Sequence, residues 1–80
     1  MEQMKAEKLV KKLICSSLKM GKIYEDKEQK SLDRALYLGF SMGYYCAARD
    51  VYVSEGLGGQ MDFPNFRETV RRELAENEGE

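Results

Sequence analysis

The sequence predicts an all-α protein of three helices, over about residues 2–20, 27–54 and 63–76, dominated by the long central helix. Three observations indicate this fold class. Apolar residues recur every three or four positions along most of the chain, which is the spacing of amphipathic helices. Proline, which breaks helices most strongly, occurs once, at Pro64. β-branched residues are scarce in the central segment, which favours a helix over a strand there.

The length of 80 residues limits the chain to a single helical domain with a modest core, and residues 77–80 are expected to fray. Hydrophobic residues make up 42% and charged residues 34%, as in a folded chain. No apolar run is long enough to span a bilayer, and the start has no hydrophobic signal core. We therefore expect a cytoplasmic protein with no membrane partner. Cys15 and Cys46 are too few for a disulfide framework, which fits a reducing compartment.

The first helix is predicted over residues 2–20 because its apolar side chains occupy one half of the helical wheel. Those side chains are Ala6, Leu9, Val10, Leu13, Ile14 and Leu18, and Ser17 lies in the same half. Lysines crowd the opposite half of the wheel, at Lys5, Lys8, Lys11, Lys12, Lys19 and Lys22. Gly21 is expected to end the helix in the left-handed conformation, as glycine often does.

The second helix is predicted over residues 27–54, ending at Gly56, with Asp26 or alternatively Ser31 as its N-cap. At about 1.5 Å per residue it would be about 42 Å long. A compact chain of this size has a diameter of roughly 30 Å. We therefore expect either a kink near residues 39–43 or an elongated protein whose excess helix is covered by another chain.

The middle of this second helix is apolar on nearly every side. The first and third helices offer one apolar stripe each, which leaves one side of it for another chain. Small residues form a ridge on which another helix could pack closely, at Gly39, Gly43 and Ala47. Tyrosines suit an interface because they combine apolar area with a hydroxyl, so we predict that a partner binds Tyr37, Tyr44, Tyr45 and Tyr52. The alternative is that these tyrosines flank the chain's own core.

The third helix is predicted over residues 63–76, after a glycine-rich loop. Asp62 or Phe63 would cap it, with Pro64 in the first turn, where a missing N–H costs nothing. Glu68 and Arg72 are spaced to form an ion pair on its outer side. Its apolar stripe consists of Phe63, Phe66, Val70 and Leu74.

The side chains that most enzymes need are missing from the sequence. It contains no histidine, no closely spaced cysteine pair and no phosphate-binding loop motif, so we expect a non-enzyme without metal or cofactor. Asp50 shares the face of the small-residue ridge, where we expect it to be partly buried and paired rather than catalytic. The glycines at residues 56–59 indicate a helix end and a turn, and the alternative is a backbone nest for an anion.

Charge is unevenly distributed, with a net +4 in residues 1–22, −2 in residues 23–60 and −3 in residues 61–80. We call Lys5, Lys8, Lys11, Lys12 and Lys19 the lysine face, and predict that it binds the acidic surface of another protein. The alternatives are an ordinary solvated face or neutralisation by the chain's own acidic end. Nucleic acid is disfavoured because this helix lacks arginine and aromatic residues and the sequence pI is about 5.5.

These observations together predict a small protein-interaction module of the regulatory, adaptor or inhibitor type, a class that phage and other mobile elements often encode. It would act as a homo-oligomer and bind another protein. Two alternatives stay open. One is a protein that binds a small anionic, nucleotide-like ligand between protomers, at residues 56–59. The other is a nucleic-acid-binding accessory protein that uses the lysine face.

Overall fold

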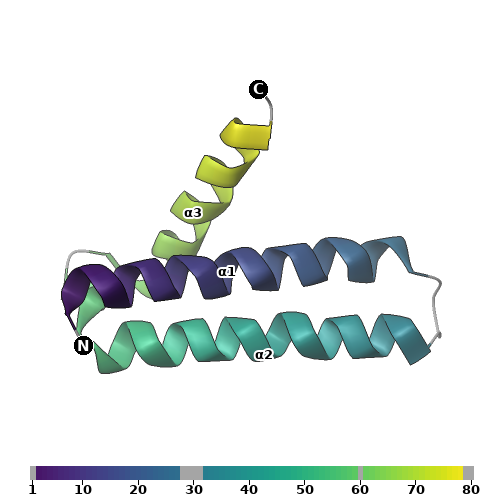
Figure 1. Cartoon of the computed structure of the whole chain (residues 1–80), viewed down its shortest axis with the longest axis horizontal. Coiled ribbons are helices and arrows are strands. Elements are labelled where there is room, and N and C mark those ends of the chain that lie inside the picture. Colours follow the sequence, from purple (N-terminus) through teal and green to yellow (C-terminus); the bar gives the residue numbers. More distant parts are fainter. Residues whose placement is uncertain (1, 28–31, 60, 79–80) are drawn as a thin grey trace.

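Two long antiparallel helices and a shorter third helix make up the computed structural model, which describes residues 2–27, 32–59 and 61–78 (Figure 1). Helix α1 spans Gln3–Asp26, α2 spans Leu32–Ser54 and α3 spans Phe63–Glu78, with one turn of 3-10 helix, η1, at Leu57–Gly59. Helices α1 and α2 lie side by side, and α3 leaves one end of this hairpin and extends away from it (Figure 1). The predicted all-α fold with three helices is confirmed.

Helix α1 continues past Gly21 to Asp26, so the prediction that this glycine ends the helix is wrong. Gly56 is the one glycine with a positive φ among the described residues. Gly21 faces α2, and a Cβ there would lie 3.5 Å from Oγ of Ser41, which is an ordinary van der Waals contact. One turn earlier, the Ser17 hydroxyl donates to the Ser41 carbonyl at 2.8 Å, and the Ser41 hydroxyl donates back to the Ser17 carbonyl at 2.9 Å. This contact holds the two helices together.

Helix α2 begins at Leu32 in the described chain, and Asp26, predicted as its cap, is instead the last residue of α1. The alternative cap, Ser31, lies outside the described residues. Its C-terminal end is confirmed, because α2 stops at Ser54 and Gly56 follows with a φ of 69°. Figure 1 shows no sharp bend in α2, and the molecule measures 40 × 30 × 18 Å. The molecule is thus elongated rather than kinked at this helix, and the expected cover by another chain stays a prediction.

Helix α3 has the N-terminal cap that the sequence predicts. The backbone N–H of Asn65 donates to Oδ1 of Asp62 at 3.0 Å, and Pro64 stands in the first turn. The helix runs to Glu78 rather than to residue 76, so residues 77 and 78, expected to fray, are helical. Residues 79 and 80 lie outside the described chain.

The hydrophobic core lies where α3 crosses the hairpin. The ring of Tyr52 lies 5.5 Å from the ring of Phe63 and 5.0 Å from that of Phe66, between centroids, and this aromatic contact fixes the start of α3 against α2. The buried members of the core cluster are Val10, Ile14, Ala48, Tyr52, Phe63 and Val70. In the described part of the chain, none of the helices combines the length and the hydrophobicity needed to cross a membrane.

Candidate functional site

The surface of α2 that α1 and α3 leave uncovered carries large apolar side chains. No charged residue occurs between Arg34 and Arg49, so the middle of the helix is uncharged. A single exposed leucine is ordinary on a protein surface, but a group of exposed large apolar side chains on one helix is characteristic of an interaction site. We call this patch the outer face of α2 and define it by five residues that are 39–59% exposed, Leu36, Leu38, Phe40, Met42 and Tyr44, together with Gly39 and Gly43.

The small-residue ridge runs through the outer face. A Cβ atom added to Gly39 or to Gly43 would meet no other atom within 4 Å, whereas Ala47 is half-buried. No helix in the described part of the chain therefore packs on the two glycines. That a helix of a second chain packs closely on them stays a prediction. Asp50, expected to be partly buried on this ridge, is exposed, because no element among the described residues covers it.

Tyr52 is a core residue and is not available to a partner in this structure, being 2% exposed. Its hydroxyl donates a hydrogen bond to the carbonyl of Met61, just before α3. Burial raises the pKa of this hydroxyl, and the carboxylates of Asp62 and Glu7 raise it further. Tyr52 is therefore part of the chain's own core, which is the alternative that the sequence left open for the tyrosines.

The other three tyrosines lie at different depths. Tyr44 is exposed on the outer face, whereas Tyr37 is half-buried with its ring 5.9 Å from that of Phe40. Tyr45 is also half-buried, between the ring of Phe63 at 5.3 Å and the guanidinium carbon of Arg67 at 5.3 Å. Of the four predicted interface tyrosines, Tyr44 is thus the one most open to solvent.

The lysine face is exposed along α1, except for Lys11, which is half-buried and pairs with Glu7 at an Nζ to Oε1 distance of 3.7 Å. An exposed pair of this kind adds little stability. Lys19 differs from the other members because it also lines a groove between α1 and α3. The predicted role of this face in binding an acidic protein stays a prediction.

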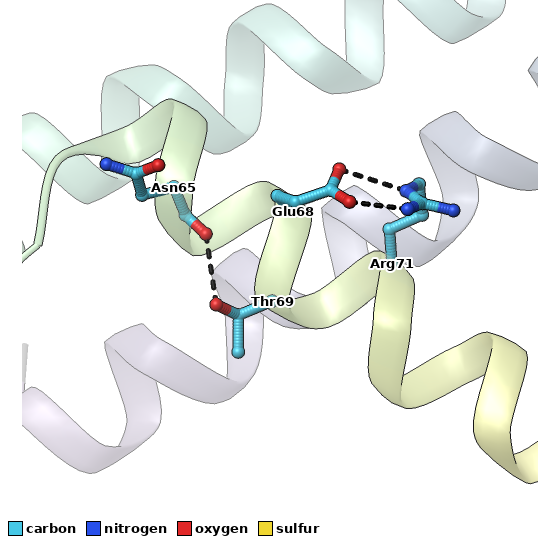
Figure 2. Close-up of polar contacts among 4 residues, drawn as sticks. All are labelled: Asn65, Glu68, Thr69 and Arg71. Atoms are coloured by element: carbon cyan, nitrogen blue, oxygen red, sulfur yellow. Dashed lines mark hydrogen bonds and ion pairs between the residues drawn. The ribbon is translucent and has the colours of Figure 1, made fainter.

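The groove between α1 and α3 has a volume of about 380 Å³ and was missed by sequence reasoning. Its walls combine apolar and cationic side chains, and Cys15, Ser17 and Ser41 also line it. Arg71 is held by Glu68, since its Nε donates to Oε2 at 2.9 Å and a second N–H donates to Oε1 (Figure 2). This hydrogen bonding lowers the pKa of the Glu68 carboxyl. The partner of Glu68 is therefore Arg71 and not the predicted Arg72. Side chains three or four residues apart both meet on a helix, so the spacing alone does not distinguish the two arginines.

A second hollow, of about 540 Å³, lies beside the glycine-rich segment. Gly56 ends α2 in the left-handed conformation, as its position after the helix predicts. The charged residue that lines the hollow is Glu7, a carboxylate. This lining gives no electrostatic support to an anion at residues 56–59, because a carboxylate repels it.

Comparisons of the chain with protein-family models, with curated proteins and with solved structures give no match. The surfaces described above are therefore the basis for inferring a function. They offer an apolar helix face, a row of lysines and a cationic groove, which are means of binding.

Proposed function

We propose that this chain is a non-enzymatic protein-interaction module that assembles with a second copy of itself through the outer face of α2. The observation that carries the proposal is the exposure of that face, where Met42 is 59% and Leu36 is 52% exposed. Burying one large apolar side chain contributes about 1.5–3 kcal/mol. At about 100° per residue, Leu36, Phe40 and Met42 lie on the glycine side of the helix, so a second copy can cover these three together.

The outer face is complementary to itself when two copies of α2 pair in antiparallel directions. With the pair centred between the two glycines, Gly39 of one copy lies opposite Gly43 of the second copy, which permits a close approach. Asp50 then lies near Leu32 of the second copy, at the N-terminal end of α2. The positive end of the helix dipole stabilises a carboxylate there. A parallel pair would instead bring two Asp50 carboxylates together, so we favour the antiparallel arrangement.

Self-association on α2 leaves the lysine face of α1 free for a different protein. The two surfaces lie on separate helices, and the lysines provide an electrostatic attraction that speeds the association with an acidic partner. A small dimer that presents two cationic faces fits a regulatory, adaptor or inhibitor role. This arrangement favours a protein partner over nucleic acid for the reasons of composition given above.

The test compares two methionines that have nearly the same exposure but lie on different helices. Met42 on the outer face is 59% exposed and Met4 on α1 is 67% exposed. Sedimentation equilibrium of the wild type should give twice the chain mass of 9.2 kDa. Met42→Glu should give the monomer mass, because the dimer would bury an unpaired carboxylate, while Met4→Glu should behave as the wild type.

Two results would contradict the proposal. One is a wild-type protein that stays monomeric up to high micromolar concentration. The other is an equal loss of association in both glutamate variants, which would show a general effect of charge rather than contact through α2. Circular dichroism of both variants checks that each keeps its helix content.

A further inference from the structure

The groove between α1 and α3 gathers positive charge on a chain whose net charge is −1. The charged residues that line it carry a net +3 and are Lys19, Lys22, Arg67, Arg71 and Glu25. The Glu68 carboxylate, which is bonded to Arg71, offsets one of these charges. The hollow beside the glycine-rich segment, in contrast, has Glu7 as its charged lining residue. Cations gathered in a concave site focus the electric field and raise the local concentration of anions.

Both arginines of the groove are held in position by neighbouring side chains. The Arg67 guanidinium carbon lies 5.3 Å from the ring centroid of Tyr45, and its Nε is buried with no acceptor among the described residues. Two N–H groups of Arg71 bond to Glu68, which fixes the plane of its guanidinium (Figure 2). A fixed guanidinium loses little side-chain entropy when it binds a carboxylate or phosphate, for which its fork of N–H groups is suited. The buried Nε of Arg67 also gains from any acceptor that reaches it.

The remaining lining of the groove is largely apolar. Leu18 of α1 stands on one side, and Leu74 and Ala75 of α3 stand on the other. These side chains offer nothing to a bare inorganic ion but do contact a ligand with an apolar part. The volume of about 380 Å³ is at the lower end of small-molecule sites, which typically measure about 300–1,000 Å³.

We infer that this groove binds a small organic anion that joins a carboxylate or phosphate head to a short apolar body. The head would lie among Arg67, Arg71 and Lys19, and the body would pack between Leu18 and Leu74. Arg67 and Arg71 are one helical turn apart, so both guanidinium groups can reach one head group. The site is lined by α1 and α3 and by Ser41 of α2, which is not part of the outer face, so it goes beyond the proposed self-association and does not depend on it.

The experiment is a calorimetric titration of the full chain with four probes, hexyl phosphate, hexanoate, inorganic phosphate and 1-hexanol. Hexyl phosphate and hexanoate should each bind at least about tenfold more tightly than inorganic phosphate or hexanol, because only they combine a charged head with an apolar body. Arg67→Gln should weaken the binding of hexyl phosphate by about tenfold or more, as expected for losing charge-assisted hydrogen bonds. Arg72→Gln changes an exposed arginine of α3 that does not line the groove, so it should bind as the wild type does.

A second pair of variants avoids the contact between Arg67 and Tyr45. Lys19→Gln changes an exposed lysine that lines the groove, and Lys12→Gln changes an exposed lysine of α1 outside it. Weaker binding of hexyl phosphate in the Lys19 variant alone would support the site. Equal effects in the two variants would show attraction by the whole lysine face and would overturn it.

Two further outcomes would also overturn the inference. Inorganic phosphate that binds as tightly as hexyl phosphate would show simple ion attraction at the surface. The peptide acetyl-Leu-Glu-Glu-Leu-amide supplies the same chemistry from a protein source. If this peptide binds and loses affinity in the Arg67 variant while hexyl phosphate does not bind, the groove belongs to a protein partner rather than to a small ligand.

Discussion

Replacing Gly39 and Gly43 by alanine should affect the single chain and the assembled protein in opposite directions. In the single chain, neither added Cβ meets an atom within 4 Å, so nothing resists the change. Glycine within a helix is about 0.8–1.0 kcal/mol less favourable than alanine, so the double variant should gain about 2 kcal/mol. For a domain of this size such a gain raises the melting temperature by roughly 8–16 °C.

In the antiparallel pair, the same two methyl groups would lie where the two helices approach most closely. Overpacking of a close contact costs about 1–3 kcal/mol, which corresponds to a dissociation constant about 5- to 150-fold higher. Thermal unfolding followed by circular dichroism at low concentration measures the first effect. Sedimentation equilibrium at high concentration measures the second effect on the same samples.

The combination of the two measurements makes the reasoning refutable. A double variant that is more stable and associates as well as the wild type would show that the glycine ridge is not the contact. A double variant that is less stable at low concentration would contradict the open surroundings of Gly39 and Gly43. Gly21→Ala is the matched control, because it places a methyl group on α1, away from the outer face of α2.

Three further results are expected. Gly21→Ala should raise the free energy of unfolding by up to about 1 kcal/mol, because alanine favours the helix more than glycine does and the added Cβ makes an ordinary 3.5 Å contact with Ser41. A lower melting temperature in thermal unfolding would contradict a helical conformation at this residue. Tyr52→Ala should lower the free energy of unfolding by about 3–5 kcal/mol and expose α3 amides to hydrogen exchange, whereas Tyr52→Phe should lower it by about 1 kcal/mol. Equal losses in the two variants would refute the packing role of the ring. Because Arg71 lowers the pKa of Glu68, the ionised carboxylate contributes stability that is complete above its ordinary pKa and is lost as pH falls through the lowered value. The helix signal of the wild type should therefore approach that of Glu68→Gln on acidification, and a pH-independent difference would contradict the contact.

The sequence predicts the first and third helices well because each has a clear apolar stripe, and it predicts the second because that segment lacks proline and is poor in β-branched residues. It fails where packing decides between two local outcomes. Gly21 illustrates the failure, since a glycine near the end of an apolar pattern is equally consistent with a helix end and with a helix that continues. The packing of α1 on α2, which includes the hydrogen bonds between Ser17 and Ser41, favours the helix that continues. In the same way, Arg71 and Arg72 are both spaced to reach Glu68, and the side-chain conformation selects Arg71.

The candidate surfaces differ in how far the sequence could reveal them. The excess of apolar side chains on the central helix is visible in the sequence, and the structure leaves them exposed at residues such as Phe40 and Met42. The sequence does not predict that Tyr52 is buried while Tyr44 is exposed, because this difference depends on where α3 crosses the hairpin. The groove was not predictable for the same reason, since it brings together Lys19 and Arg67 from two different helices.

The uneven placement of buried residues along the hairpin links assembly to local order. Among the described residues, α1 has no buried side chain after Ser17 and α2 has none before Ala48, so this half of the hairpin has fewer buried side chains than the half that α3 crosses. The outer face of α2 lies in the less buried half. Its described helical residues should open locally more often than those near the crossing with α3, and their amides should exchange faster in dilute solution. A second copy bound to α2 would slow this amide exchange in proportion to the fraction of chains that are paired. The exchange rate would therefore depend on the concentration of the protein itself.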